Sequence, residues 1–396
     1  MTSSSAGNSL HPPASTLQQE VVVLAVDTHT HTVDPRLTSH LNSETMRRRS
    51  PLPLLLLLLL LFLISSVWGA KKKEFRICAY NLQKFNSTKA SNYRVMHTLT
   101  RILSRCDISL LQEVMDPQGK AIKTLLTALN RYESQTYKSV SSQFLGDSAK
   151  DMQQYVFIYR TETVSVLSEH QYQKKDSFVR RPFAVHFQSQ KTAVDRFILV
   201  ALHTEPKQAV QEIDRLYDVF QEVSKKWNNM NVMFLGDFHA SCAYMTRHDK
   251  KKIRLFQTKF SWLIPDRMDT TVDEDTSCAY DRIVVHGQSF LKGISPFSAT
   301  VFNFGKEFKL PHSKVRELSD HYPVEVVEIL RGQKVHVVHV PQRKSRAVSR
   351  RRRSSGAMCD QRTTCSTNEE DTLTSLYQRS YICKEMYHSV TNGKPV

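Results

Sequence analysis

The sequence predicts an α/β domain of about 260 residues in which two packed sheets are flanked by helices. Short apolar runs rich in β-branched residues recur from Glu74 to Leu330, and several are apolar on both faces. Such runs are typical of central strands that helices cover. The runs are FRICAYNL (75–82), ISLLQEV (108–114), YVFIYR (155–160), FAVHF (183–187), FILVALHT (197–204), NVMFLGDF (231–238), RIVVHG (282–287) and YPVEVVEIL (322–330).

Amphipathic helical segments lie between these runs. Val95, Leu99, Ile102 and Leu103 share one face of a first predicted helix. Apolar positions at helical spacing trace a longer second helix, and they are Val210, Ile213, Leu216, Tyr217, Phe220, Val223 and Trp227. Each helix therefore has an apolar face to bury against a sheet.

Residues 46–70 have the pattern of a secretory signal. Three arginines precede an unbroken leucine-rich stretch, and small residues follow it. A membrane anchor is the alternative, but the apolar run is about 17 residues, at the lower limit for a spanning helix, so we expect cleavage near Gly69 or Ala70. Residues 1–45 then form an upstream extension, disordered or not translated, and the protein is expected in the endoplasmic reticulum lumen and outside the cell.

The chain carries a net charge of +17, which favours a polyanionic partner. Residues 333–396 are expected to form a basic, mostly disordered tail, and the stretch RKSRAVSRRRR (343–353) has seven basic residues and no acid. Such a tail can bind nucleic acid or an anionic membrane by counterion release.

Secretion makes disulfides plausible among the seven cysteines. Cys78 and Cys106 lie in apolar segments and are interpreted as small buried hydrophobes. Cys242 and Cys278 lie in loop-like sequence and are expected to pair. The remaining three, Cys359, Cys365 and Cys383, lie in the tail. Asn86 begins the tripeptide NST and is a candidate glycan site.

Polar residues recur where the apolar runs stop. Asp237 and His239 follow NVMFL in the stretch GDFHA (236–240), and other runs end in the same way. The full set is Asn81, Glu113, His203, Asp237, Asp281, Asp320 and His321. Together these residues predict a rim of acids, bases and metal ligands at the strand ends.

Six motifs in order give the chain a resemblance to the secreted deoxyribonuclease I family. They are QEV (112–114), LHTEP (202–206), GDFHA (236–240), WLIPD…DTT (262–271), CAYDRIVV (278–285) and SDHYPVEV (319–326). The resemblance implies a catalytic domain over residues 71–332, folded as a four-layer α/β/β/α sandwich of two packed mixed sheets. It also implies divalent-metal-dependent endonucleolytic cleavage of double-stranded DNA, free or in chromatin.

The resemblance assigns the metal-holding role to Glu113, with Asn81 and Asp320 nearby. Their oxygens suit Mg²⁺ or Ca²⁺, with Mn²⁺ as a substitute. His203 and His321 are the implied proton carriers for water and for the leaving oxygen.

Further roles follow from the same resemblance. Asp237 and Asp281 supply charge that orients histidines, metal or the scissile phosphate, and Arg180 holds a backbone phosphate. The stretch Asp269, Thr270 and Thr271 matches a structural calcium loop, and the family's main disulfide falls on Cys242 and Cys278.

Three positions depart from the family pattern. His239 replaces an asparagine that donates to a phosphate oxygen, and an imidazole can still donate there, which predicts activity shifted toward lower pH. Gln153 replaces a glutamate that hydrogen-bonds the basic histidine, so the charge that favours an imidazolium is missing unless Asp151 takes its place. Arg181 replaces an acid, so a second calcium site is expected to be absent.

Three functions are consistent with these residues. The first is an active, monomeric secreted endonuclease. The second is a weakly catalytic or inactive nucleic-acid-binding protein, favoured by Gln153, His239 and the arginine-rich tail. The third is a phosphoesterase acting on lipids or inositol phosphates, which CAYDRIVV (278–285) argues against.

Overall fold

Two six-stranded sheets lie face to face in the computed structural model, which describes residues 74–133, 136–148, 150–175 and 177–333. The predicted extension, signal segment and basic tail lie outside the described residues, with their three cysteines.

The first sheet has the strand order β11-β12-β1-β2-β4-β3, and the second has the order β5-β6-β7-β8-β10-β9. The pairs β1–β2 and β7–β8 are parallel and the other pairs are antiparallel, so both sheets are mixed. The strands are β1 Phe75–Phe85, β2 Ile108–Val114, β3 Tyr137–Ser141, β4 Gln154–Arg160, β5 Ser165–Gln171, β6 Phe183–Gln188, β7 Arg196–Ala201, β8 Val232–Asp237, β9 Phe260–Trp262, β10 Asp281–His286, β11 Thr300–Val301 and β12 Val324–Glu328.

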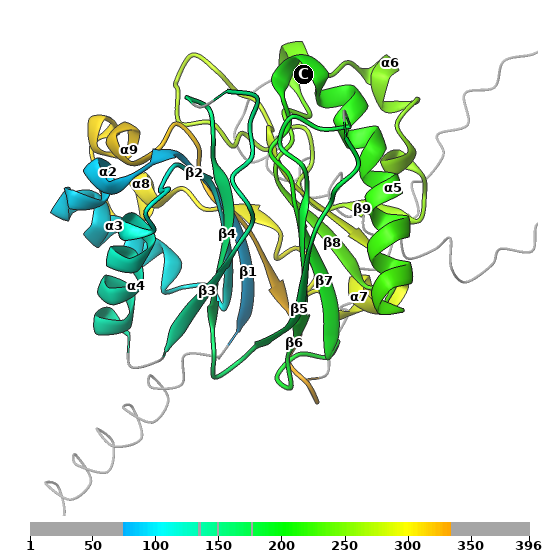
Figure 1. Ribbon diagram of the computed structural model, residues 1–396, viewed down its shortest axis with the longest axis horizontal. Coiled ribbons are helices and arrows are strands. Elements are labelled where there is room, and N and C mark those ends of the chain that lie inside the picture. Colours follow the sequence, from blue (N-terminus) through cyan, green and yellow to red (C-terminus); the bar gives the residue numbers. More distant parts are fainter. Residues whose placement is uncertain (1–73, 134–135, 149, 176, 334–396) are drawn as a thin grey trace, which may run out of the picture. The chain divides into compact units, whose positions relative to one another are not determined.

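Helices cover the outer faces of the two sheets (Figure 1). On the first sheet lie α2 Ser87–Ser91, α3 Tyr93–Leu103, α4 Lys120–Tyr132, α8 Phe304–Glu307 and α9 His312–Leu318. On the side of the second sheet lie α5 Ala209–Trp227, α6 Arg247–Lys250 and α7 Gln288–Gly293. Short 3₁₀ turns occupy Pro206–Gln208, Cys242–Tyr244 and Arg254–Phe256.

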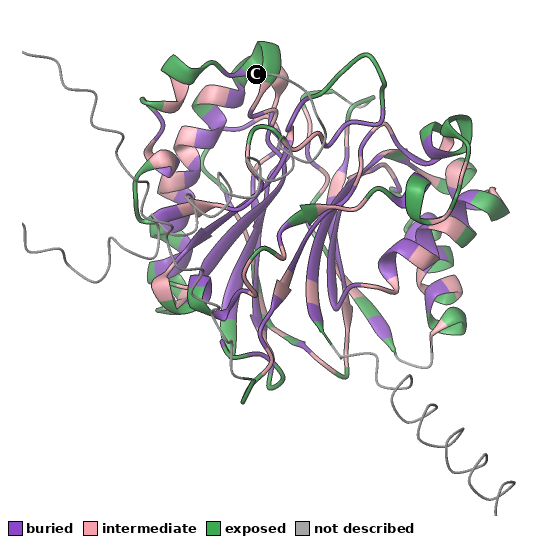
Figure 2. Cartoon of the chain, turned by 180° about the vertical axis from the view of Figure 1, so that it is seen from behind, coloured by how far each residue is buried: buried purple, intermediate pink, exposed green. Residues whose placement is uncertain are grey.

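Three apolar cores separate the four layers, and the strands are the most continuously buried elements (Figure 2). One core fills the space between the sheets, with Phe157, Phe187 and Phe197 among its members. A second lies between the first sheet and α3 and α4, and a third lies between the second sheet and α5. The predicted α/β/β/α sandwich is confirmed.

Both helices with a named apolar face are present as α3 and α5. All eight apolar runs contain strands. Four strands escaped the sequence pattern, namely β3, β5, β9 and β11. All four are the outermost strands of their sheets. Edge strands are half exposed, and the polar residues in SVLSEHQ of β5 hide the apolar run.

The interpretation of Cys78 and Cys106 as unpaired was wrong, because they form a disulfide. Both are buried as predicted, at 2% and 1% exposure. Their Cα atoms lie 6.2 Å apart because parallel pairing brings the start of β2 beside β1. They are separated by 28 positions in the sequence, and the segment between them includes two helices, so only the sheet register reveals the pair.

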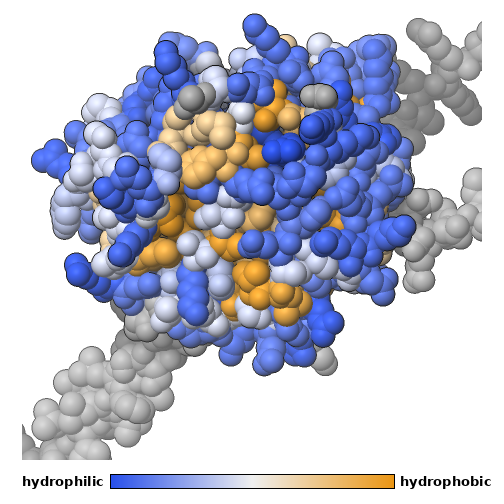
Figure 3. Space-filling model, in the orientation of Figure 1, coloured by the Kyte–Doolittle hydropathy of each residue, from blue (hydrophilic) through white to orange (hydrophobic). Residues whose placement is uncertain are grey.

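Hydrophilic side chains predominate on the face drawn in Figure 3, where the apolar ones gather in the middle. Among the described residues, none of the helices is both long enough and apolar enough to cross a membrane.

Candidate active site

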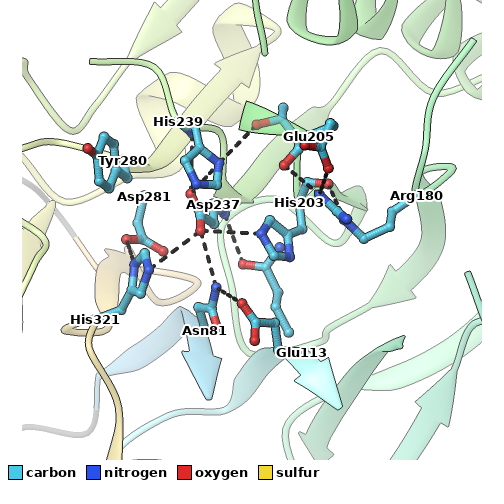
Figure 4. A network of polar contacts seen from close by, with 12 residues as sticks. Asn81, Glu113, Arg180, His203, Glu205, Asp237, His239, Tyr280, Asp281 and His321 are labelled. Atoms are coloured by element: carbon cyan, nitrogen blue, oxygen red, sulfur yellow. Dashed lines mark hydrogen bonds and ion pairs between the residues drawn. The ribbon is translucent and has the colours of Figure 1, made fainter. Parts of the chain in front are cut away.

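Side chains from both sheets converge at one edge of the sandwich (Figure 4). In the first sheet, Asn81 lies on β1 and Glu113 on β2, and these strands run parallel. In the second sheet, His203 follows β7 and Asp237 ends β8, which are parallel to each other. Asp281 begins the antiparallel β10 and is in register with Asp237. The strand register therefore brings these side chains together at one edge of the sandwich.

Asp237 is the hub of the cluster and is 1% exposed. Its Oδ2 accepts a hydrogen bond of 3.1 Å from the Asn81 amide. The same oxygen lies 3.5 Å from Nε2 of His203 and 3.6 Å from Nε2 of His321. Its Oδ1 lies 3.2 Å from Nδ1 of His239. One carboxylate thus faces three imidazoles.

These neighbours control the charge of the hub. Burial alone would raise the pKa of Asp237, but the imidazoles of His239, His321 and His203 hold that pKa well below its ordinary value. The carboxylate is therefore ionised throughout the neutral range.

The two predicted catalytic histidines differ in their electrostatic environment. Burial, reinforced by Arg180 and the other imidazoles, holds the pKa of His203 well below its usual value in spite of Asp237. Burial also disfavours charge on His321, but Asp281 and Asp237 outweigh it and raise the pKa of His321 to about 10. At neutral pH, His203 is therefore a free base and His321 is a cation.

His321 forms a buried pair with Asp281. Its Nδ1 lies 2.7 Å from Oδ2 of Asp281, whose side chain is fully buried. The backbone N–H of His321 donates to the Ser319 hydroxyl at 3.0 Å, and that hydroxyl donates to the Asn81 carbonyl at 2.7 Å. The ring is thereby oriented with Nε2 toward Asp237.

Gln153 occupies the position that the sequence predicted for the partner of His203. Its Oε1 lies 3.0 Å from Nδ1 of His203, so the ring carries a proton on Nδ1 and leaves Nε2 without one. Asp151 does not take its place, because the Asp151 carboxylate is exposed and accepts from Ser148 at 2.6 Å. The amide orients the ring without adding negative charge.

Glu113 lies beside the hub and is reached through Asn81. Its Oε1 accepts from the Asn81 amide at 3.1 Å, and its Oε2 accepts from the Lys84 backbone N–H at 3.0 Å. Glu113 has a φ of 55°, where the β1–β2 and β2–β4 registers both shift. Left-handed backbone at a bulge re-aims the side chain, and such strain is common at functional sites.

Asp320 lies at the edge of the cluster, with its Oδ1 3.9 Å from Nε2 of His321. The Lys89 ammonium feels the negative charge of both Asp320 and Glu113, although burial dominates and lowers the pKa of Lys89 to about 8. Its Nζ donates to the carbonyls of Leu82 and Gln83, each at 2.8 Å. Glu113, Asn81 and Asp320 therefore present hard oxygen donors of the type that Mg²⁺ and Ca²⁺ prefer.

Arg180, which the sequence predicted to hold a phosphate, is buried, with 6% of its surface exposed. Its Nε donates to the His203 carbonyl at 3.1 Å, and its Nη2 donates to the Thr204 carbonyl at 2.7 Å. Nη2 also lies 3.4 Å from the Glu205 carboxylate. These contacts brace the segment that carries His203.

His239 is held among aromatic rings at the edge of the cluster. Its ring centroid lies 5.2 Å from those of Tyr244 and Tyr280, and its ring stacks on His203 at 5.7 Å. Nδ1 also lies 3.2 Å from the Thr204 hydroxyl. Its backbone is left-handed, with a φ of 46°, two residues after Asp237.

The predicted calcium loop packs against the loop of His321. Asp269 accepts from the backbone N–H and hydroxyl of Thr271, at 2.9 and 2.6 Å, and from the Cys278 N–H at 3.1 Å. Thr271 forms an antiparallel bridge with His321. The neighbouring Cys242–Cys278 disulfide is present, as predicted.

Several residues that build the site were not selected from the sequence. Gln112 is fully buried, donates to the Leu202 carbonyl at 2.8 Å and accepts from the Asp237 N–H at 2.9 Å. It tethers the two sheets at the hub, and its signal was a polar residue inside an apolar strand. Gly236 has a φ of 130°, and a Cβ there would lie 2.4 Å from the Leu202 carbonyl oxygen, so GDFHA (236–240) requires its glycine.

Comparison with known proteins agrees with this geometry. Residues 78–321 match the model of the Endonuclease/Exonuclease/phosphatase family. The chain is 45% identical to mouse Deoxyribonuclease-1-like 2 over 254 residues, which are 63% of this chain and 90% of the relative. It is 44% identical to human Deoxyribonuclease-1-like 1 over 256 residues, 64% of this chain and 83% of the relative.

Two further comparisons cover the same region. Human Deoxyribonuclease gamma is 40% identical over 258 residues, 63% of this chain and 84% of the relative. Among solved structures, the human Nocturnin catalytic domain has a TM-score of 0.47 and 13% identity, over 65% of this chain and 94% of that chain.

The fold and the family match define the chain as a member of the endonuclease/exonuclease/phosphatase family, and its relatives place it in the deoxyribonuclease I family within that class. This membership confirms the predicted resemblance and the prediction of an enzyme.

Proposed function

We propose that the protein is a divalent-metal-dependent endonuclease that hydrolyses phosphodiester bonds of DNA. One observation carries the proposal. An uncharged imidazole and a protonated imidazole face the same carboxylate, with Nε2 of His203 and of His321 at 3.5 and 3.6 Å from Asp237. The names of the relatives support DNA as the substrate.

Hydrolysis then needs two proton transfers, one from the attacking water and one to the leaving oxygen. The uncharged Nε2 of His203 takes a proton from water, and the hydroxide attacks phosphorus. As the bond from phosphorus to the leaving oxygen breaks, His321 donates its proton to that oxygen. Asp281 holds His321 in its charged form and orientation, and Asp237 keeps both rings directed at the reacting group.

A bound cation offsets the negative charge of the phosphodiester. Glu113, Asn81 and Asp320 are the residues that would hold Mg²⁺ or Ca²⁺ there, with Mn²⁺ as a substitute. Asp269 and Thr271 are proposed to hold a structural calcium ion, whereas Arg181 leaves no acid for a second one. Arg180 and His239 are proposed to contact the DNA backbone from either side of the hub.

The proposed cellular address is secretory, with residues 46–70 as a signal and the mature enzyme outside the cell as a monomer. The two disulfides suit an oxidising compartment. Asn86 is a proposed glycan site, and its side-chain Oδ1 caps α2 by accepting from the Lys89 N–H at 2.9 Å. The basic tail is proposed to bind DNA or anionic membranes.

A weakly catalytic DNA-binding protein is the second candidate. The observation that favours it is the uncharged amide of Gln153 on Nδ1 of His203, because no carboxylate stabilises the imidazolium that forms when His203 accepts a proton.

Cleavage of supercoiled plasmid tests the proposal. The protein, expressed from the full sequence and purified, is assayed with Mg²⁺ plus Ca²⁺ and with Mn²⁺. We expect cleavage that His203→Ala lowers by about 10²- to 10⁴-fold, the usual contribution of a general base. The matched control His170→Ala should retain activity, because His170 lies on β5 and pairs with Glu222.

Two results would redirect the assignment. Tight DNA binding without cleavage in any of these metals selects the second candidate. Hydrolysis of sphingomyelin or phosphoinositides in place of DNA selects a phosphoesterase that acts on lipids.

A further inference from the structure

We infer that Glu212 is a positioning residue, a buried carboxylate that ties the loop of Arg180 to the segment of His203 and so holds the proposed general base in place. This inference rests on the proposed function, because it assigns a role relative to His203. Glu212 lies in the first turn of α5 and is fully buried, at 0% exposure. A carboxylate removed from water in this way needs hydrogen-bond donors around it, and here backbone N–H groups of two separate segments supply them.

The two oxygens of Glu212 bind two different segments. Oε1 accepts from the Val179 N–H at 2.8 Å, and Oε2 accepts from the Glu205 N–H at 2.9 Å. Val179 directly precedes Arg180 in the chain, and Glu205 lies two residues after His203. One side chain of α5 therefore takes a donor from each segment and holds the two segments together.

Tyr155 on β4 joins the same two segments. Its hydroxyl accepts from the His203 N–H at 2.8 Å and donates to the Arg180 carbonyl at 3.1 Å. The Arg180 side chain, which Figure 4 shows beside His203, donates through Nε to the His203 carbonyl at 3.1 Å. Glu212, Tyr155 and Arg180 thus form a brace that restrains the backbone on both sides of the His203 ring.

The charge of Glu212 controls both of its hydrogen bonds. An ionised carboxylate accepts two N–H bonds, whereas a protonated carboxyl turns one oxygen into a donor that opposes an N–H group. Burial raises the pKa of Glu212 to about 7, although the two N–H groups and the Arg180 guanidinium lower it. The other charged or titratable groups that face it are the Glu205 carboxylate, which raises this pKa, and the Tyr155 hydroxyl. One bond of the brace should therefore be lost as pH falls through about 7.

Glu212→Gln removes the charge of the side chain and keeps its size. The amide has one acceptor oxygen and one donor nitrogen, which is the arrangement of the protonated carboxyl. We expect the variant to cleave plasmid at least about tenfold more slowly than wild type at about pH 8, because a small displacement of a catalytic group is costly. The two rates should converge toward about pH 5.5, where wild type has lost the same bond. Glu222→Gln on the same helix is the matched control and should follow wild type at every pH, because Glu222 pairs with His170.

Hydrogen exchange tests the brace without any cleavage. The purified full chain is exchanged at the same two pH values, and the peptides that contain Val179 and Glu205 are followed by mass spectrometry. At about pH 8 these peptides should exchange at least about tenfold faster in Glu212→Gln than in wild type, as expected for the loss of a charge-assisted hydrogen bond. Toward about pH 5.5 the two proteins should exchange alike.

Tyr155→Phe is the second variant, and it tests the brace even where Glu212→Gln does not fold. It removes the acceptor of the His203 N–H and the donor to the Arg180 carbonyl but leaves Glu212 free to titrate. We expect it to slow cleavage by about fivefold or more and to keep the pH dependence of wild type.

A wild-type cleavage rate in Glu212→Gln, or in Tyr155→Phe where Glu212→Gln does not fold, would overturn the positioning role. A Glu212→Gln rate that is lower than wild type by the same factor at every pH would also overturn it, because a merely structural role predicts a constant ratio. Unchanged exchange of both peptides would show that Glu212 does not hold these segments. An inactive wild type whose exchange still responds to Glu212→Gln would instead contradict the proposed function.

Discussion

Single side chains decide how the hub around Asp237 works, and Gln153 is the most informative of them. It keeps the hydrogen bond that orients His203 but brings no charge to it. A carboxylate at this position would both orient the His203 ring and raise its basicity. In this chain the amide does only the first.

Gln153→Glu should raise the cleavage rate by about tenfold or more, because a carboxylate on Nδ1 favours the imidazolium that His203 forms on accepting a proton. The pKa of His203 should rise in the same variant, and NMR titration of labelled histidine measures it. Gln153→Ala is the paired control, since it removes orientation as well and should lower the rate. An unchanged pKa with a lower rate in Gln153→Glu would contradict this account of basicity.

At the scale of elements, two disulfides pin segments that the sheets bring together. Cys78–Cys106 ties β1 to the segment before β2, and Cys242–Cys278 ties the turn after β8 to the segment before β10. They close segments of similar length, with separations of 28 and 36 residues. Both cysteines of the second pair lie three residues from a member of the catalytic cluster, His239 or Asp281, whereas in the first pair only Cys78 lies so close to one, Asn81.

Removal of either pair as a double alanine variant should lower the free energy of unfolding by about 3–4 kcal/mol, the loop-closure value for these lengths. Urea unfolding measures this loss. Cys78→Ala/Cys106→Ala should retain cleavage under native conditions, whereas Cys242→Ala/Cys278→Ala should also lose activity, because it frees the segments of His239 and Asp281. Equal loss of activity in both variants would refute the distinction.

For the domain as a whole, stability should depend on pH through a carboxyl far from the hub. Glu328 on β12 is 1% exposed, and burial, with a contribution from nearby Asp107, raises its pKa well above the ordinary value. The folded protein therefore holds a proton there that the unfolded chain releases. Its stabilising contribution is complete below the unfolded pKa of about 4.3 and declines as pH rises toward the folded pKa.

Glu328→Gln should remove this dependence, because an amide of the same shape has no proton to lose. The difference in melting temperature between Glu328→Gln and wild type should grow in favour of the variant between pH 5 and 8. Thermal unfolding across that range measures it, and Glu169→Gln on the exposed face of β5 serves as the control. A constant difference across the range would show that Glu328 does not titrate on unfolding.

Much of this molecule follows from its sequence alone. Apolar periodicity revealed the central strands and the faces of α3 and α5, because burial on both sides of a strand leaves a continuous apolar run. Residues that flank such runs, including Asp237, His203 and His321, stood out as polar groups where none was needed for packing. Their assignment to one family followed from the order of the motifs, and the comparisons confirmed that family.

Tertiary structure decided what depends on register and on neighbours distant in the chain. The Cys78–Cys106 bond, the tether formed by Gln112 and the burial of Glu328 arise from strands that pair within a sheet or pack between the sheets across long separations in the sequence. The opposite charge states of His203 and His321 also required the fold, because two histidines of the same intrinsic pKa diverge only when burial and carboxylates act on them unequally. The sequence specifies which titratable groups are present. Only the packing of the two sheets sets the burial and the neighbouring charges that determine the pKa of each group.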